Sequence, residues 1–431
     1  MPRSVGLFVV LCAVVLRAVA PLAAQEPPAT RPALQTEPRN VVLWINIDGL
    51  RPDYIERANP PYITRLMKDG AWSKQLVPVF PSLTFPSHVS LATGVRVERH
   101  GIPANSYYDA QTHQTYNYPA DNDKVRAEAI WTTATRQGIR ASVIDWPLSH
   151  RQKGPHAAAF FGQSYDTNLS DDARLQMAIT PYLLDNDPRP LQLVMGYASK
   201  VDVVGHGSGP DSDDVLDVLR KTDALLEGVV RQVIARFDQR MNKQDELYVL
   251  ITTDHGMSPV TTQASAERLL GPSFSPEVTI VTSGSVGFVH LDKLPESERT
   301  KRRDAMLERL KQFDFVEAFT REQAREKYGL DDPSRVGDLV LSLKRGYTFT
   351  RIRQQVTLPV SQRGPLGMHG YDPATNPEMN GFMLVWRYRK PIGGIDLGKV
   401  DSLQLHPTVA KLLGIAPAEH ATAKPIDLPG K

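Results

Sequence analysis

Short, almost continuously apolar runs of strand length recur along the chain. Such runs are typical of parallel strands that are buried on both faces. The runs that we assign to strands are 40–47, 141–144, 191–197, 247–253, 285–291, 339–343 and 382–386. Between them lie segments with apolar residues at helical spacing, at 62–68, 89–92, 124–137, 213–237, 296–312 and 408–413. This alternation predicts an α/β fold with a mostly parallel central sheet flanked by helices.

The first 24 residues have the layout of a secretory signal peptide. Arg3 precedes an apolar run at 5–16, and small residues lead up to Ala24. The alternative is an uncleaved membrane anchor, but the run is short for a bilayer and Arg17 follows it. We therefore expect cleavage after Ala24, no stable membrane span in the mature chain, and a loose Pro-rich linker at 25–39.

Removal of that segment leaves the chain electrically balanced. The 431 residues include 50 Lys and Arg against 48 Asp and Glu, and the segment takes away two arginines and no acid, leaving 48 against 48. A chain without net positive charge lacks the basic footprint of a nucleic-acid-binding protein. The one cysteine, Cys12, lies in the same segment, so any metal site must use His, Asp and Glu. A cleaved leader on a mature chain without disulfides suits a bacterial periplasm, and a secreted form is the alternative.

Metal-binding residue types follow the predicted strands. Ligands collect at the carboxyl ends of the strands of an open parallel sheet. The residues found there, or in a glycine-rich loop further on, are Asp48, Asp202, His206, Asp254, His255 and His369. Each alone could be a helix cap or a hydrogen-bonded loop residue, but together they suit zinc or a similar ion. Six ligands are enough for two ions, which can clamp the attacking and leaving oxygens of a phosphoryl transfer.

A nucleophile candidate lies in the segment 80–88, between the first strand and an apolar helix. Pro86 suits the first helical position, and helix amides at that point attract an anion such as phosphate. The available hydroxyls belong to Ser82, Thr84 and Ser87. The alternative is that Thr84 or Ser87 only caps the helix.

Seven sequence blocks resemble, in order, the type I nucleotide pyrophosphatase/phosphodiesterase family of the alkaline phosphatase superfamily. They are IDGLRPDY (47–54), TFPSHVSLATG (84–94), ERHGIPANSYYD (98–109), DVVGHGSGP (202–210), TTDHGM (252–257), GMHGYDP (367–373) and HPTVAKLLGI (406–415). The resemblance implies an alkaline-phosphatase-like catalytic domain at 40–415, followed by a tail at 416–431. Residues 258–363 are expected to form an inserted region that caps the site.

The resemblance also implies roles for single residues. Thr84 would be the nucleophile and form a covalent phospho-threonine, and Asn105 would contact a phosphate oxygen. One Zn²⁺ would be held by Asp48, Thr84, Asp254 and His255, and the other by Asp202, His206 and His369. Phe85 would line the pocket beside the nucleophile. His88 and His100 are expected to be structural or to support the ligands.

These observations favour an exported two-zinc hydrolase that cleaves phosphodiester or pyrophosphate bonds of a small molecule. The loop after Asn105 contains no Lys or Arg, which favours diesters over monoesters, although a monoesterase is an alternative. Tyr165 and the pair 160–161 could stack a nucleobase. A run of Trp-Pro-Leu-Ser-His at 146–150 departs from the family's Trp-Pro-Gly pattern, so a phospholipid head group remains an alternative to a nucleotide. A metal-stabilised scaffold without activity is the third hypothesis.

Overall fold

The computed structural model describes residues 39–429, apart from 272–274, 352–353 and 361–363. The expected signal peptide at 1–24, and all of the expected linker except Arg39, lie outside the described residues. Strands are present at every run assigned to a strand, and helices at all six helical segments, although the helix within 124–137 is shorter than expected. Within the described ranges, no helix combines the length and the apolar character needed to cross a bilayer.

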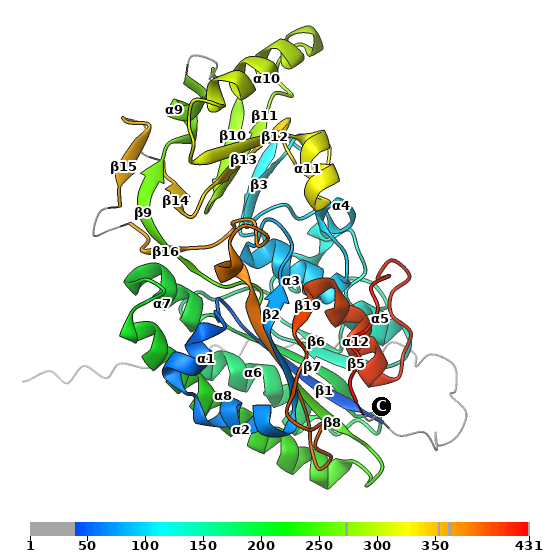
Figure 1. Ribbon diagram of the computed structural model, residues 1–431. Helices are drawn as coiled ribbons and strands as arrows, with labels where there is room; N and C mark the ends of the chain where they lie inside the picture. Colours follow the sequence, from blue (N-terminus) through cyan, green and yellow to red (C-terminus); the bar gives the residue numbers. More distant parts are fainter. Residues whose placement is uncertain (1–38, 272–274, 352–353, 361–363, 430–431) are drawn as a thin grey trace, which may run out of the picture. The chain divides into compact units, whose positions relative to one another are not determined.

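A nine-stranded sheet forms the centre of the fold (Figure 1). Its order is β18-β2-β17-β8-β1-β7-β5-β6, with β19 beside β2. All neighbours are parallel except β17, which runs antiparallel to both β2 and β8. The strands are β1 (Val41–Ile47), β2 (Ala71–Val77), β5 (Arg140–Val143), β6 (Phe160–Phe161), β7 (Leu191–Ala198), β8 (Leu247–Thr252), β17 (Gly381–Arg387), β18 (Ile395–Asp396) and β19 (Lys399–Asp401). The predicted mostly parallel sheet is therefore confirmed.

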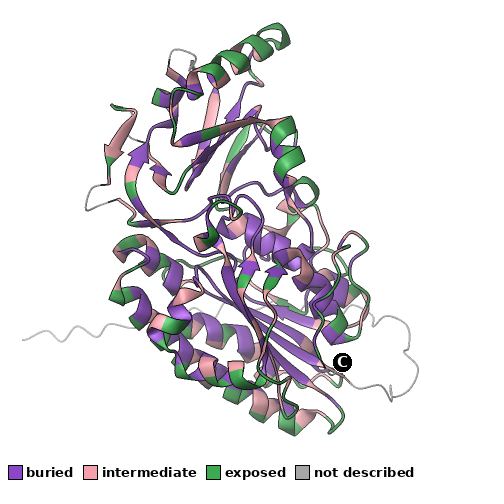
Figure 2. Ribbon diagram, in the orientation of Figure 1, coloured by how far each residue is buried: buried purple, intermediate pink, exposed green. Residues whose placement is uncertain are grey.

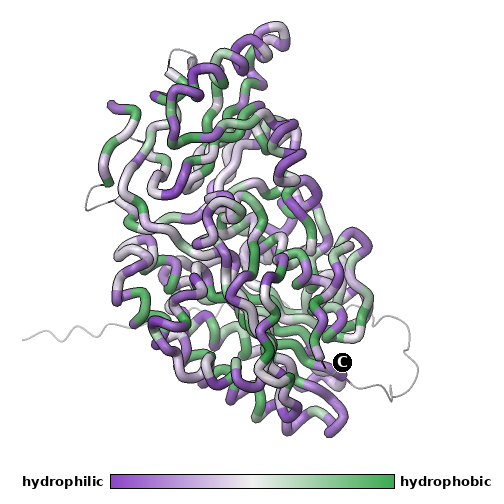
Figure 3. The backbone as a smooth tube through the Cα atoms, in the orientation of Figure 1, coloured by the Kyte–Doolittle hydropathy of each residue, from purple (hydrophilic) through white to green (hydrophobic). Residues whose placement is uncertain are grey.

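Helices cover both faces of this sheet. Alternate residues of β1 enter different cores: Leu43 and Ile45 pack on one face, and Val42 and Trp44 on the other. The first face is covered by α1 (Asp53–Ala58), α2 (Pro61–Asp69), α6 (Asp171–Leu184) and α8 (Asp213–Arg240). The second is covered by α3 (Thr84–Thr93), α5 (Ile130–Arg136) and α12 (Leu405–Leu413). Burial on both faces explains the apolar runs, which are visible as buried and hydrophobic central strands (Figures 2 and 3).

Two of the expected strands lie outside the central sheet. Residues 285–291 and 339–343 form β11 (Val286–His290) and β13 (Leu339–Leu343), the inner strands of a separate antiparallel sheet. The alternation alone groups these runs with the parallel strands, but both lie within 258–363, the region expected to be an insertion. Their outer neighbours are β10 (Thr279–Ser283) and β12 (Val316–Thr320). Both inner strands contribute to separate apolar clusters, Val289 to one and Phe288 to the other, so they have the same continuous apolar pattern as a parallel strand.

The remaining elements surround these two sheets. A third sheet contains β9 (Ser258–Ala264), β14 (Gly346–Phe349), β15 (Thr357–Pro359) and β16 (Gly367–Met368). A hairpin is formed by β3 (Ser106–Asp109) and β4 (Gln114–Asn117). The other helices are α4 (Val97–His100), α7 (Lys200–Ser208), α9 (Ala266–Leu270), α10 (Glu296–Leu310) and α11 (Arg321–Tyr328), with 3-10 turns at Asn122–Lys124, Pro377–Met379 and Ser402–Gln404.

The helix expected at 124–137 begins six residues later, at Ile130. Contacts with distant segments hold the first part in a non-helical conformation. The Arg126 N–H donates to the His100 carbonyl at 3.0 Å, and its guanidinium pairs with Asp332. These partners compete with the local helical hydrogen bonds and override the helical pattern of the sequence.

A buried histidine connects α12, α3 and the last segment of the chain. The Nδ1–H of His406 donates to the Ala92 carbonyl at 2.8 Å, and Nε2 accepts from the Ala418 N–H at 3.0 Å. The second contact requires neutral imidazole, because a protonated Nε2 cannot accept a hydrogen bond. Burial lowers the pKa of His406 from 6.5 to about 4.

We predict that acid weakens this connection. Below pH 6.5 His406 is protonated in the unfolded chain, whereas in the folded protein it stays neutral down to about pH 4. The free energy of unfolding therefore falls as the pH falls through that window. Between pH 7.5 and 4.5 the stability advantage of wild type over His406→Leu should shrink by roughly 2–3 kcal/mol. Urea denaturation of both proteins at each pH measures it. Parallel pH dependences in the two proteins would show that His406 does not titrate in this way.

Candidate metal centre

The order of the central strands explains how the candidate ligands meet. Strand β1 lies between β7 and β8, and the three strands run in parallel. Asp48 follows β1, Asp254 follows β8, and Asp202 lies in the helix after β7. Gly49 permits the close approach, because a Cβ there would lie 2.9 Å from the Cα of Asp202 and its φ of +67° is in the left-handed region. Three acidic residues that lie 52 to 206 positions apart in the sequence thus share one edge of the sheet.

The first group of ligand-type residues is Asp48, Asp254 and His255. The Nε2 atom of His255 lies 3.4 Å from Asp48 Oδ1 and 3.1 Å from Asp254 Oδ2. The same atom is 3.3 Å from Thr84 Oγ1. His255 Nδ1 is 2.9 Å from the Gly256 carbonyl, to which it donates its hydrogen, so Nε2 is an unprotonated acceptor.

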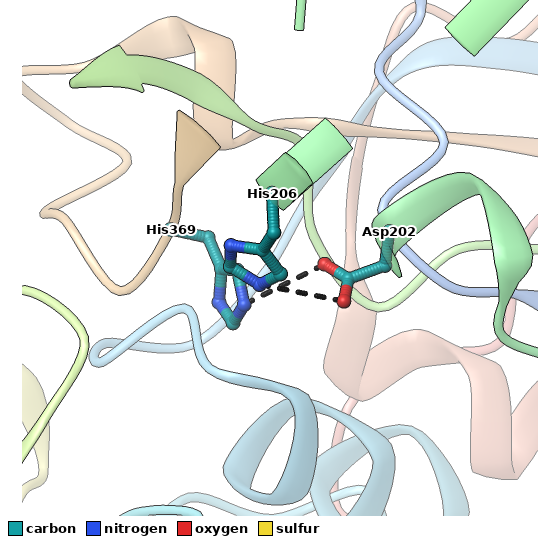
Figure 4. A group of neighbouring side chains, drawn as sticks. All are labelled: Asp202, His206 and His369. Atoms are coloured by element: carbon teal, nitrogen blue, oxygen red, sulfur yellow. Dashed lines mark ion pairs between the residues drawn. The ribbon is translucent and has the colours of Figure 1, made fainter. Parts of the chain in front are cut away.

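The second group is Asp202, His206 and His369 (Figure 4). Each imidazole directs Nε2 at the same carboxylate, His206 at 3.4 Å from Oδ2 and His369 at 3.6 Å from Oδ1. The Nδ1 atoms donate to main-chain carbonyls, that of Gly367 at 2.7 Å and that of Ser82 at 3.2 Å. His369 is placed by β16, whose Met368 pairs with Ser258 just beyond the first group. The rings of His255 and His369 stack with centroids 3.6 Å apart, so the two groups are neighbours.

In both ligand groups, carboxylate oxygens lie close to imidazole Nε2 atoms, and both kinds of atom are hydrogen-bond acceptors. Asp48 Oδ1, Asp202 Oδ1 and Asp254 Oδ2 are buried without a hydrogen-bond partner. Burial, followed by the charges of the neighbouring carboxylates, raises the pKa of Asp48 and Asp254 well above the usual range, and burial raises the pKa of Asp202. Burial also lowers the pKa of His255 to about 3, and that of His369 well below its ordinary value. The two groups thus supply several lone pairs and contain no Lys or Arg, and their nitrogen and carboxylate donors fit zinc or a similar divalent ion.

Thr84 lies at the start of α3. The helix begins at Thr84 rather than at Pro86, so the expected first helical position is two residues off. The Phe85 N–H donates to Asn105 Oδ1 at 2.8 Å, so the amide NH₂ is the other end of that side chain, and it lies within hydrogen-bond reach of the Tyr118 hydroxyl. Thr84 Oγ1 therefore lies between the first ligand group and a side chain that can donate to an anion.

These side chains open onto a cavity of about 360 Å³. Its walls include Asp48, Thr84, Asn105, Asp202, His206 and His369, together with the aromatic residues Phe85, Tyr118, Tyr165 and Tyr197. Asp254 and His255 are buried behind it. Tyr165 lines this cavity, whereas the pair 160–161 forms β6 and is not among the residues of its wall.

Lys200, Tyr118 and Tyr197 are among the residues of the cavity wall that were not singled out from the sequence. Lys200 is the one lysine or arginine among the described residues that line it. Tyr118 follows the β3–β4 hairpin, and the sequence gives no signal for it. Tyr197 pairs with Asn46 across β7 and β1, close to the strand ends, and its hydroxyl donates to Asp48 Oδ2. Treating the last strand residues as candidates would have identified Tyr197.

Comparison with known proteins gives a consistent match. The family model described as type I phosphodiesterase / nucleotide pyrophosphatase matches residues 42–372. A human bis(5'-adenosyl)-triphosphatase is 28% identical over 387 residues, which cover 87% of this chain and 78% of the relative. Human ectonucleotide pyrophosphatase/phosphodiesterase family member 7 is 26% identical, over 91% of this chain and 83% of its own length.

Solved structures share the fold. Human ectonucleotide pyrophosphatase/phosphodiesterase 5 superposes with a TM-score of 0.75 at 23% identity, covering 88% of this chain and 96% of its own. The murine protein of the same name, as an inactive variant in which alanine replaces a threonine and in complex with AMP, gives a TM-score of 0.74 at 23% identity with the same coverage.

Proposed function

The chain belongs to the type I phosphodiesterase/nucleotide pyrophosphatase family, and from this premise we propose that it is an exported enzyme that hydrolyses nucleotide phosphodiester or pyrophosphate bonds at a two-zinc centre. The observation that carries the proposal is the set of buried, unpartnered carboxylate oxygens facing bare imidazole nitrogens around Thr84. Export rests on the signal-peptide pattern of residues 1–24.

Each ligand group would hold one ion. Asp48, Asp254 and His255, with Thr84, would hold the first, and Asp202, His206 and His369 the second. Bound zinc would lower the pKa of the threonine hydroxyl and offset the charge that develops on the phosphoryl oxygens. The backbone carbonyls that accept from each Nδ1–H keep every Nε2 lone pair directed into the site.

Thr84 is the proposed nucleophile. Its Oγ1 forms a bond to phosphorus while the bond from phosphorus to the leaving oxygen breaks, and the hydroxyl proton passes to solvent. Water then attacks the phospho-threonine, which releases the nucleotide and restores the hydroxyl. The Asn105 NH₂, held by the contact between its Oδ1 and Phe85, donates to a non-bridging oxygen. The inactive threonine-to-alanine variant of the murine relative supports this role.

The cavity favours a diester over a monoester. A terminal phosphate carries an additional negative charge, and monoesterases stabilise it with cationic side chains. Lys200 is the one such side chain among the described residues of the wall, and it is exposed. The bulk of the wall is aromatic or aliphatic, which suits an attached organic group.

A nucleoside is the group that the wall fits best. Phe85, Tyr118 and Tyr165 offer ring faces and edges for stacking, and Phe85 and Tyr118 already meet edge to face at 5.6 Å. The name of the human triphosphatase relative and the AMP bound to the murine relative support a nucleotide. A phospholipid head group remains the second candidate, because exposed apolar side chains such as Val203 also line the cavity.

We predict that Thr84→Ala lowers kcat/KM on the p-nitrophenyl ester of thymidine monophosphate at least about 1,000-fold, because the alanine side chain cannot form the covalent intermediate. Chelation of metal should abolish wild-type turnover, and added zinc should restore it. Thr84→Ser is the matched control and should retain measurable activity. Undiminished turnover in the alanine variant, or after exhaustive chelation, would refute the proposed chemistry.

A second prediction separates a nucleotide from a head group. Tyr165→Ala should reduce kcat/KM on the thymidine ester by about 5-fold to 100-fold, because a stacking contact stabilises the bound base by about 1–3 kcal/mol. On methyl p-nitrophenyl phosphate, which has no base, the same variant should match wild type. Phe160→Ala serves as the control, since Phe160 is exposed and lies outside the cavity wall. Equal losses on both substrates would argue against base recognition by Tyr165.

A further inference from the structure

The two oxygens of the Asp48 carboxylate have different surroundings. Oδ1 faces His255 Nε2 at 3.4 Å and has no hydrogen-bond partner. Oδ2 accepts a hydrogen bond from the hydroxyl of Tyr197. Both residues are buried, Asp48 with 2% and Tyr197 with 5% of its surface exposed. One oxygen is therefore occupied by the protein, and the other is left for an ion.

The phenol is held firmly in this position. The backbone of β7 is paired on both sides, with β1 and with β5. The ring of Tyr197 meets the ring of His88 edge to face at 5.2 Å, and His88 meets Trp146 in the same way at 5.1 Å. His88 Nδ1 donates in turn to the Thr84 carbonyl at 2.8 Å. This row of rings connects the hydroxyl on Asp48 to the backbone of the proposed nucleophile.

A carboxylate on its own rotates easily about the bond to Cβ, since that torsion is broad. The charges of Asp254 and Asp202 act on Asp48 from the other side of the site. A fixed donor on Oδ2 opposes rotation and keeps the Oδ1 lone pair directed at the first ligand group.

We propose that Tyr197 is a positioning residue of the metal centre, which orients Asp48 so that Oδ1 binds the ion of the first group. This inference rests on the proposed function, because it assumes that the group holds an ion. It assigns to Tyr197 a contribution to metal affinity that is separate from any contact with substrate in the cavity.

The test is zinc binding by the full chain after chelation, measured by competition with a chromophoric chelator. Tyr197→Phe removes the hydroxyl and keeps the ring. We expect wild type to bind two ions, and the variant to bind one of them about 10- to 100-fold more weakly with the other affinity unchanged. At limiting zinc the variant should lose kcat/KM, and excess zinc should restore it, with KM for the thymidine ester unchanged.

Tyr182→Phe is the matched control. Tyr182 lies in α6 with 4% of its surface exposed, and its hydroxyl has no partner among the described residues. The Tyr182→Phe variant should bind both ions as wild type does. The melting temperatures of Tyr197→Phe and Tyr182→Phe without metal report whether both variants fold. In an Asp48→Ala background, the effect of Tyr197→Phe on zinc affinity should vanish, because Tyr197 acts through Asp48.

The outcomes separate the inference from the proposed function. Two ions in wild type and unchanged affinities in Tyr197→Phe would overturn the role of Tyr197 and leave the enzyme assignment standing. A higher KM that excess zinc does not reverse would make Tyr197 a substrate contact instead, which also overturns the inference. A wild-type chain that binds no zinc would overturn both.

Discussion

Three buried carboxylates and three imidazole nitrogens that face one another without a hydrogen between them are the feature on which the rest of this structure depends. Such an arrangement is unfavourable in a bare protein, because buried charges of one sign repel and lose their hydration. The fold nevertheless holds the groups together, through the parallel register of β7, β1 and β8 and through backbone carbonyls that fix every imidazole. Divalent cations, as proposed above, would offset this repulsion by binding to the carboxylate and imidazole lone pairs.

The sequence predicted this edge of the sheet well because the chemistry there follows a general rule. Asp48, Asp202 and Asp254 were identified by their positions after buried strands, and parallel strands carry such residues to the same edge. His369 came from its glycine-rich loop, and the family resemblance grouped the ligands into two sets. The central sheet followed from runs that are apolar on both faces.

Other features depended on contacts that a local pattern does not contain. The strands β11 and β13 have the same continuous apolar character as the central strands, because two different clusters cover their faces. The helix expected from 124 begins at Ile130, because Arg126 is bonded to His100 and Asp332. Tyr197 and Tyr118 are ordinary aromatic residues in the sequence, and only the packing places them on the wall of the cavity.

The measurement that tests the central claim most directly compares the stability of wild type and Asp254→Asn with and without zinc. Asparagine keeps the shape of the side chain and removes one buried charge. Without metal, the variant should be more stable than wild type by about 1–3 kcal/mol in urea denaturation. Saturating zinc should reverse that order, because the ions bind the folded wild type more tightly. A variant that is less stable than wild type without metal, and that zinc stabilises equally, would contradict this account of the site.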